Sequence, residues 1–436
     1  MPKRAKAKPH QRQRNLGRLK PSTLELEITA LAYGGRGIAR KEGKVYFVEH
    51  AVVGDKVAAT VTKDKKKWAE AKVTKLLETS SKRRQAQCEY FGKCGGCDWQ
   101  NMEYSEQVYW KKDYIVKALK KIGQTEATLD GFYESSSHYG FRNRIQLQFT
   151  IQDGKAFLGY FSRSSHKIIK IDFCEIAANG INKAIKEILS FDFASSVKNL
   201  DSCRLELQED IEGRVHLNIA DNSKIRSPDF KRALNKIAQK SQLLIVGAES
   251  FVYDEHCNKK YLTRPGIFQQ INLELNHSLR DLIKNIIDQI NPKKVLDLYC
   301  GSGNLSLALS GKSRVVKGIE LNKTAIEIAR ENQSFFSPEG LSYQTADSAD
   351  FLAKQAKEFD ADLIICDPPR AGLEKALDFI ADLECRTIIY VACDPNSLAK
   401  DFKELKKAGY NIEKLYGFDF FPQSYHIETV ALLQLA

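Results

Sequence analysis

The sequence predicts a mixed α/β protein with three ordered parts, because its hydrophobic pattern changes twice along 436 residues. Residues 24–78 alternate apolar and polar positions in short runs broken by glycine, which is typical of a small β-barrel. From residue 293, apolar strands alternate with helical stretches, which is typical of a doubly wound, mostly parallel sheet. The region between them mixes strand-like and helical segments, so we expect a central α+β domain.

The predicted boundaries follow these changes in pattern. Residues 1–20 contain eight Lys/Arg and no acidic residue, so we expect a basic, disordered arm. We place the barrel at residues 21–80, the central domain at 85–285 and the doubly wound domain at 286–436. Within the central domain, strands are expected at 141–149, 155–161, 166–172, 204–209 and 214–220. A helix is expected over 273–290, where it bridges to the last domain.

The net charge of +12 lies entirely in the first part of the chain. Residues 1–84 contain 22 Lys/Arg against 8 Asp/Glu, whereas the remaining 352 residues contain 45 against 47. A basic arm joined to an ordered module is typical of nucleic-acid-binding proteins, although a solvated tail has the same composition. No apolar run approaches the roughly 18 residues that span a bilayer, and no apolar segment follows the arm as in a secretory signal. We therefore expect a cytoplasmic protein.

Clustered cysteines mark the start of the central domain. Cys88, Cys94 and Cys97 form the pattern C-x5-C-x2-C, and Cys174 is a fourth candidate ligand. The chain has ten cysteines, too few for a disulfide scaffold at this length, and cytosolic thiols stay reduced. The spacing allows either tetrahedral zinc or an iron–sulfur cluster. No ligand spacing is apparent for Cys203, Cys257, Cys300, Cys366, Cys385, His138, His166, His256 or His277.

A glycine-containing turn, DLYCGSGN at 297–304, follows the first strand of the doubly wound domain. Glu320 ends the next strand, 19 residues after Gly301, where a carboxylate can accept hydrogen bonds from both ribose hydroxyls. A dinucleotide fold would have a third glycine where Ser306 stands, so S-adenosylmethionine is a better candidate ligand than NAD. Asp347 closes the third strand, where it is placed either to meet an adenine edge or to cap a helix.

Three reactive side chains are predicted at the carboxyl edge of the same sheet. Cys393 ends one apolar strand, Asp367 follows another, and Glu428 lies beside the last strand. Arg370 follows Asp-Pro-Pro where amino-group methyltransferases of nucleic acids have an aromatic residue, which argues against an exocyclic amine as the target. Methylation at C5 of uridine needs a thiolate that adds to C6, a group on the uracil edge and a base that removes the C5 proton. The alternative for Cys393 alone is a buried apolar filler.

The carboxyl-terminal half resembles the RNA 5-methyluridine methyltransferases. That family carries DPPRAG, found at 367–372, a strand that ends in cysteine before Asn/Asp-Pro, and DFFPQSYHIE, found at 419–428. The resemblance implies a Rossmann-like methyltransferase domain, with Cys393 as nucleophile, Glu428 as general base and Asp367 hydrogen-bonded to uracil. It implies that the S-adenosylmethionine contacts are Gln270 of GIFQQIN together with Tyr299, Asn304, Glu320, Asp347 and Asp367.

The amino-terminal segments YGGRGIAR at 33–40 and VVGDKV at 52–57 resemble the TRAM domain, an RNA-binding barrel of OB-like build. The cysteine pattern resembles that of the ribosomal-RNA members, which implies that Cys88, Cys94, Cys97 and Cys174 hold a structural [4Fe-4S] cluster, favoured here over zinc. Barrel and cluster together favour 23S ribosomal RNA as the partner. The alternatives are a transfer-RNA uridine-54 methyltransferase and a non-catalytic RNA-binding assembly factor. We expect a monomer with no membrane or DNA partner.

Overall fold

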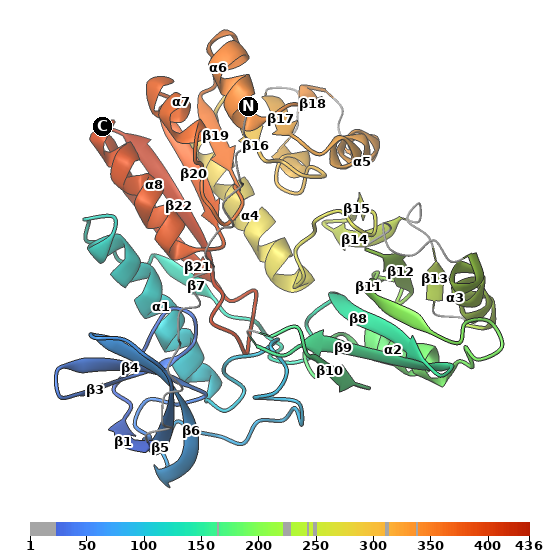
Figure 1. Cartoon of the computed structure of the whole chain (residues 1–436). Helices are drawn as coiled ribbons and strands as arrows, with labels where there is room; N and C mark the ends of the chain where they lie inside the picture. The colour runs from blue at the N-terminus through green and yellow to red at the C-terminus, as the bar shows by residue number, and fades with distance from the viewer. Residues whose placement is uncertain are drawn as a thin grey trace, which may run out of the picture. The chain divides into compact units, whose positions relative to one another are not determined.

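The computed structural model describes residues 23–163, 165–220, 228–241, 244–246, 251–309, 314–336 and 339–436 (Figure 1). The predicted basic arm, residues 1–20, lies outside the described residues. The chain forms two compact units, Met1–Arg83 and Arg84–Ala436. The second unit contains both the predicted central domain and the predicted doubly wound domain, whose boundary at residues 285 and 286 stays a prediction.

The first unit is a six-stranded sheet in the order β1-β5-β6-β4-β3-β2. Its period-two alternation places one side of each strand in a single core that includes Val48, Ala59 and Ala69. The Thr29 amide donates to the Ile38 carbonyl at 2.9 Å, so the chain after β1 meets β3 and the predicted barrel is confirmed. The strands are β1 (Thr23–Glu27), β2 (Ala30–Leu31), β3 (Gly37–Lys41), β4 (Lys44–Glu49), β5 (Lys56–Asp64) and β6 (Trp68–Glu78).

The second unit contains an eight-stranded sheet in the order β18-β17-β16-β19-β20-β22-β21-β7. Strands β16 to β20 are parallel, and β22 is antiparallel to both β20 and β21. The chain leaves β16 toward β17 and returns to β19 on the other side, so the topological switch point lies between β16 and β19. The predicted doubly wound sheet is confirmed. The strands are β7 (Gly131–Tyr133), β16 (Lys294–Leu298), β17 (Val315–Glu320), β18 (Leu341–Thr345), β19 (Leu363–Cys366), β20 (Thr387–Ala392), β21 (Tyr410–Phe418) and β22 (Glu428–Leu435).

Helices cover this sheet, and the predicted helix over 273–290 is confirmed as α4. Apolar residues of α4 and α5 pack with alternate strand residues, such as Val295 and Ile365, in one buried core. Helix α8 begins directly after β20, because Asp394 accepts a hydrogen bond from the Asn396 amide at 2.8 Å and Pro395 occupies the first turn. The bounds are α1 (Tyr104–Lys121), α4 (Leu273–Ile290), η1 (Leu307–Leu309), α5 (Lys323–Gln333), α6 (Ser348–Phe359), α7 (Ala376–Asp382) and α8 (Pro395–Lys407).

A second sheet of the same unit has the order β10-β9-β8-β11-β12-β13. Its first five members confirm the predicted strands of the central region, and β13 joins β12 in parallel. Helices α2 and α3 pack on it around a core that includes Phe149 and Phe230. The elements are β8 (Arg144–Gln152), β9 (Lys155–Phe161), β10 (Ile168–Ile171), α2 (Asn179–Ser190), β11 (Leu200–Glu209), β12 (Val215–Ile219), α3 (Pro228–Lys240) and β13 (Leu244–Val246).

Two smaller features connect the central region to the eight-stranded sheet. Strand β7 pairs in parallel with β21 at the edge of that sheet, and the Tyr133 ring stacks on Phe418 at a centroid distance of 4.3 Å. A hairpin of β14 (Val252–His256) and β15 (Lys259–Thr263) precedes α4. Its two turn residues, Cys257 and Asn258, have φ of +52° and +58°, as in a type I′ turn.

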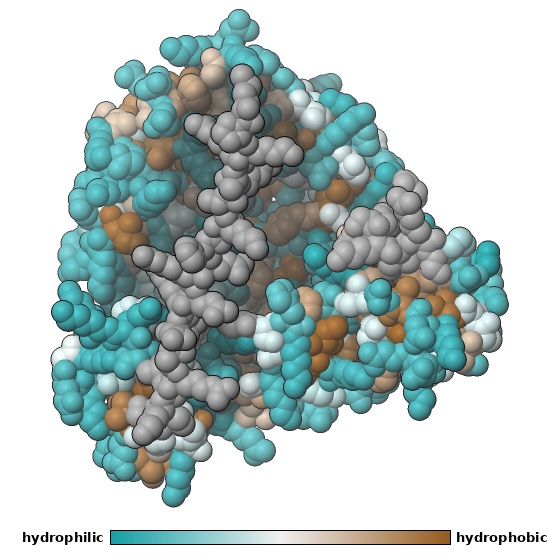
Figure 2. All heavy atoms as spheres, viewed as in Figure 1, coloured by the Kyte–Doolittle hydropathy of each residue, from teal (hydrophilic) through white to brown (hydrophobic). Residues whose placement is uncertain are grey.

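The surface is largely hydrophilic where it can be seen. In Figure 2, hydrophobic side chains appear in small separate groups outside the grey atoms, an ordinary distribution for a globular surface. Within the described ranges, no helix combines the length and the apolar character that crossing a membrane requires.

Candidate functional site

The register of three neighbouring strands brings Asp367, Cys393 and Glu428 to one edge of the eight-stranded sheet. Cys366 pairs with Tyr390, and Ala392 pairs with Thr429. Asp367 and Cys393 therefore leave the carboxyl ends of β19 and β20, and Glu428 begins β22 beside them. The structure thus brings together the three side chains that the sequence placed at strand ends.

The surroundings of Cys393 keep its sulfur protonated. Burial raises the pKa of the Cys393 thiol to about 11, and the nearby carboxylates of Glu428 and Asp367 act in the same direction. Arg370 opposes them, since its positive charge favours the thiolate. Burial, with Asp367 nearby, also raises the pKa of Glu428 well above its ordinary value. A carboxylate with a raised pKa is a stronger base than an ordinary glutamate.

His426 is held in its neutral form near these groups. Arg370 Nη2 donates to His426 Nδ1 at 3.4 Å. Burial lowers the pKa of His426 to about 4, and the positive charge of Arg370 contributes to this shift. A neutral imidazole that accepts from a guanidinium orients Arg370 in the loop that carries Asp367.

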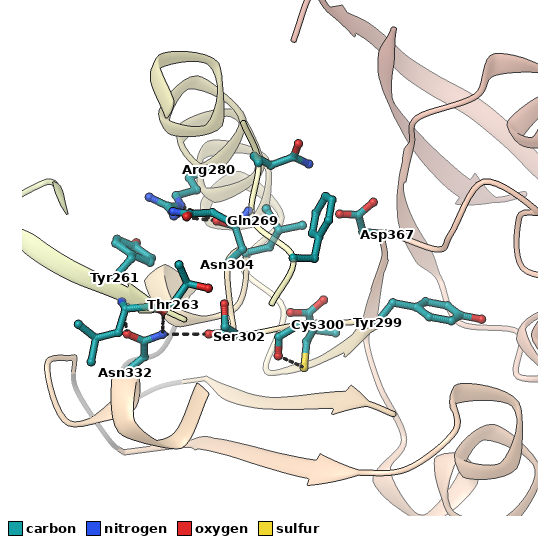
Figure 3. A pocket seen from close by; sticks show the side chains of 16 residues that line it. Tyr261, Thr263, Gln269, Arg280, Tyr299, Cys300, Ser302, Asn304, Asn332 and Asp367 are labelled. Carbon is teal, nitrogen blue, oxygen red and sulfur yellow. Dashed lines mark hydrogen bonds between the residues drawn. The ribbon is translucent and has the colours of Figure 1, made fainter. Parts of the chain in front are cut away.

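A pocket opens at the switch point between β16 and β19, and we call it the switch-point pocket (Figure 3). Figure 3 shows Arg280 and Asn304 together on one side, Asp367 on the other, and the Tyr299 ring pointing away from the glycine turn. Four of the predicted cofactor contacts, Gln270, Tyr299, Asn304 and Asp367, belong to its lining. The lining is Tyr261, Leu262, Thr263, Phe268, Gln269, Gln270, Arg280, Asp297, Tyr299, Cys300, Gly301, Ser302, Asn304, Leu305, Asn332 and Asp367.

Two buried carboxyl groups face this pocket, and only one was predicted. Burial raises the pKa of Asp297 to about 7, and burial also raises the pKa of Asp367 to about 7. The carboxylate of Asp367 adds to the shift at Asp297. A cationic ligand would stabilise both carboxylates, so the pocket suits a ligand with a sulfonium or ammonium charge. An aspartate inside the apolar run VLDL was the sequence signal for Asp297.

Glu320 and Asp347, also predicted cofactor contacts, lie outside the pocket lining. Glu320 accepts from the Gly301 amide at 3.2 Å and from the Asn322 amide at 2.7 Å, so it supports the glycine turn. Each of its oxygens keeps a second lone pair for a ligand hydroxyl. Asp347 is the N-cap of α6 and accepts a hydrogen bond from the Asp350 amide at 3.1 Å. Of the two roles expected for Asp347, an adenine contact or a helix cap, this is the helix cap.

Helix α4 holds Asn304 through contacts that the sequence did not predict. Arg280 donates to Asn304 Oδ1 from Nε at 3.0 Å and from Nη2 at 2.7 Å. Asn304 Nδ2 donates in turn to Asn276 Oδ1 at 2.9 Å. Asp254 of β14 accepts from Arg280 Nη1 at 2.7 Å, so the buried guanidinium has an anionic partner. These bonds fix the end of the glycine turn against α4.

The four predicted metal ligands line a second pocket, which we call the four-thiol pocket. Burial raises the pKa of Cys94 to about 11 and that of Cys97 to about 12, and the other thiols of the group raise them further. Among the described residues, one group of three His, Cys, Asp or Glu side chains has all its ligand atoms within 4.8 Å of one another, and it consists of His256, Cys257 and Asp281. No three of these four sulfur atoms are therefore mutually that close. The four-thiol pocket is formed by Cys88, Tyr90, Phe91, Cys94, Gly96, Cys97, Gln100, Arg142, Tyr160, Ile171, Phe173, Cys174, Glu175 and Ile176.

Comparison with known families agrees with this site. The profile described as tRNA (uracil-5-)-methyltransferase matches residues 103–436, and the TRAM domain profile matches residues 18–74. The chain therefore belongs to the tRNA (uracil-5-)-methyltransferase family and carries an amino-terminal TRAM domain.

Individual relatives match over nearly the whole chain. The 23S rRNA (uracil(1939)-C(5))-methyltransferase RlmD of Shewanella halifaxensis (strain HAW-EB4) is 30% identical, over 99% of this chain and 98% of its own length. An uncharacterized RNA methyltransferase of Aquifex aeolicus (strain VF5) is 30% identical over 96% of this chain and 100% of its own. The crystal structure of Pyrococcus abyssi tRNA (uracil-54, C5)-methyltransferase in complex with S-adenosyl-L-homocysteine shares the fold. Its TM-score is 0.70 and its identity 24%, covering 94% of this chain and 100% of that chain.

Proposed function

We propose that this protein transfers a methyl group from S-adenosylmethionine to C5 of a uridine in RNA through a covalent bond between Cys393 and C6. The observation that carries the proposal is the convergence of Cys393, Asp367 and Glu428 at one sheet edge. That edge adjoins a pocket to which Asp367 also belongs. One carboxylate thus faces both the pocket and the thiol.

Cys393, Asp367 and Glu428 carry the proposed reaction. The Cys393 thiol gives its proton to solvent water, and its sulfur forms a bond to C6 of the uracil ring while Asp367 hydrogen-bonds the uracil edge. The electron pair displaced from the C5–C6 double bond makes C5 nucleophilic. S-adenosylmethionine, when bound, would supply an electrophilic methyl group to C5 and would leave as S-adenosylhomocysteine. Glu428 then removes the C5 proton, the sulfur–C6 bond breaks, and the double bond is restored.

The residues of the switch-point pocket fit S-adenosylmethionine. Asp297 and Asp367 offer negative charge to its sulfonium and ammonium groups, and Glu320 offers free lone pairs to its ribose hydroxyls. Asn304, Gln270 and Tyr299 shape the pocket between α4 and the sheet. Asp347 is proposed to meet the adenine edge from the start of α6.

We propose 23S ribosomal RNA as the substrate, with the target base flipped out of its stack to reach Cys393. The full-length likeness to the RlmD proteins supports this over transfer-RNA uridine 54 and over a non-catalytic assembly factor. The proposal places a monomer in the cytoplasm, acting on RNA and not on DNA.

Transcripts of 23S ribosomal RNA and of transfer RNA test the substrate. Each is incubated with the protein and S-adenosylmethionine, and 5-methyluridine is measured by nucleoside mass spectrometry. The proposal predicts methylation of the ribosomal transcript and none with Cys393→Ala protein. Methylation of transfer RNA alone would contradict the ribosomal assignment, and methylation of neither by protein that binds S-adenosylmethionine would favour the assembly factor.

We also propose that Cys88, Cys94, Cys97 and Cys174 hold a [4Fe-4S] cluster. Four thiolates around one zinc ion, at Zn–S about 2.3 Å, would lie roughly 3.8 Å from each other. In the four-thiol pocket no three of the four sulfur atoms lie within 4.8 Å of one another, and a [4Fe-4S] cluster binds each thiolate to a different iron atom. Metal binding would displace the protons that burial keeps on the Cys94 and Cys97 thiols.

Iron and sulfide analysis of anaerobically purified protein tests the cluster. We expect about four irons and four sulfides per chain, loss of both in Cys174→Ser, and retention in the control Cys393→Ser. Stoichiometric zinc in the four-thiol pocket would contradict the proposal.

A further inference from the structure

A second group of side chains that could hold a metal ion lies outside the linings of both pockets, where the β14–β15 turn meets α4. We propose that His256, Cys257 and Asp281 form a site for Zn²⁺. These three are the residues whose ligand atoms all lie within 4.8 Å of one another in the described parts of the chain. The proposal is independent of the proposed enzymatic function, because none of the three belongs to the switch-point pocket, the sheet edge or the four-thiol pocket.

The distances between the ligand atoms match a tetrahedral ion. His256 Nε2 lies 3.3 Å from Asp281 Oδ2 and 3.7 Å from Cys257 Sγ. Around tetrahedral zinc, with bonds of about 2.0 Å to nitrogen and oxygen and about 2.3 Å to sulfur, such pairs are roughly 3.3 and 3.6 Å apart. One ion could therefore bind all three atoms with little movement.

The backbone directs the ligands toward each other. Cys257 occupies the first turn position of the hairpin with a positive φ of 52°, a conformation that cysteine rarely adopts. The His256 ring stacks on His277 at a centroid distance of 4.6 Å, so packing limits its rotation. Asp281 lies one turn further along α4 than His277, which places both side chains on one helix face.

The ligand chemistry favours zinc over harder cations. A thiolate, an imidazole and a carboxylate form a mixed set that zinc accepts, whereas Mg²⁺ and Ca²⁺ prefer oxygen alone. His277 Nε2 lies 2.7 Å from Asp254 Oδ1, so His277 is already engaged and water would fill the fourth position. Zinc would thus join the hairpin turn to α4, one residue from Arg280, which holds Asn304 of the switch-point pocket.

Protection of a single thiol from alkylation tests the site. Anaerobic protein with its metal centre intact is treated with iodoacetamide, with and without equimolar Zn²⁺, and Cys257 labelling is followed by peptide mass spectrometry. Cys257 is exposed, so it should react freely without zinc. We expect zinc to slow this labelling at least about tenfold, because a metal-bound thiolate is a poor nucleophile. Mg²⁺ should give no protection.

Matched variants separate a metal site from an ion pair. Asp281→Ala and His256→Ala should each abolish zinc protection while leaving Cys257 reactive. Glu255→Ala removes an exposed acid next to His256 on the other face of the strand and should retain protection. Equal labelling of wild-type Cys257 with and without zinc, or protection that survives Asp281→Ala, would overturn the proposal.

Discussion

Gln107 of α1 exchanges two hydrogen bonds with Gln423, which lies in the loop 419–427 between β21 and β22. The two residues are 316 positions apart in the sequence. The Gln423 amide donates to Gln107 Oε1 at 2.9 Å, and Gln107 Nε2 donates to Gln423 Oε1 at 3.1 Å. The Gln423 carbonyl accepts from the Asp98 and Trp99 amides, directly after Cys97. Gln423 therefore links the four-thiol pocket to the loop that ends at Glu428.

Replacing Gln107 by methionine should loosen this link. The change leaves the buried Gln423 amide without its acceptor, and each such group costs about 1–3 kcal/mol of the free energy of unfolding. We expect a lower urea midpoint and a methylation rate that falls more than the affinity for S-adenosylmethionine. The exposed control Gln355→Met should change neither. An unchanged rate in folded Gln107→Met protein would show that the loop does not depend on this pair.

Affinity for S-adenosylmethionine should rise with pH up to about 7 and level off above it. The free protein holds Asp297 and Asp367 at pKa values of about 7 because burial disfavours their charge. A cationic ligand lowers both pKa values, so binding releases protons below pH 7. The affinity should therefore rise by up to about tenfold per pH unit for each carboxylate. Calorimetry between pH 5.5 and about 8.5 measures this dependence. Neutral adenosine is the control ligand, and an equal pH dependence for both ligands would contradict the assignment.

Glu428→Gln should trap the reaction after methyl transfer. The amide does not accept the C5 proton, so a covalent protein–RNA species that contains the methyl group should accumulate. Loss of a carboxylate that raises the pKa of Cys393 should leave adduct formation itself unimpaired. Denaturing gels with methyl-labelled cofactor measure the species, and Glu413→Gln on the exposed side of β21 is the control. Multiple turnover by Glu428→Gln protein would remove Glu428 as the base.

Asp254→Asn should weaken both the fold and the cofactor pocket. Asp254 is fully buried and pairs with Arg280, so its loss leaves a buried guanidinium without a counter-charge, at a cost of about 3–5 kcal/mol. Burial opposes ionisation of Asp254, but His277 and Arg280 hold its pKa below the ordinary value. Its contribution to stability is therefore present above the unfolded pKa and is lost as pH falls through the folded one. Thermal unfolding measures this, with the exposed Asp288→Asn as control, and equal stability of both variants would contradict the prediction.

The sequence predicted the sheet edge well because strand ends are set by local pattern. Asp367, Cys393 and Glu428 follow or precede apolar runs, and parallel strands bring their carboxyl ends together. Strand β7 was missed because three residues carry no periodicity. Arg280 was missed because it lies among the buried, mostly apolar residues of α4, and its contact with Asn304 forms only in the folded chain. Cys257 showed no ligand spacing because its neighbour Asp281 comes from another element.

The covalent role of Cys393 is tested most directly with RNA that contains 5-fluorouridine at the target position. Fluorine does not leave C5 as a proton does, so the sulfur–C6 bond should persist after methyl transfer. We predict a denaturation-resistant protein–RNA adduct, mapped by peptide mass spectrometry to Cys393 and absent in Cys393→Ala. Turnover of normal RNA by a preparation that forms no adduct with the fluorinated RNA, or an adduct on another residue, would contradict it.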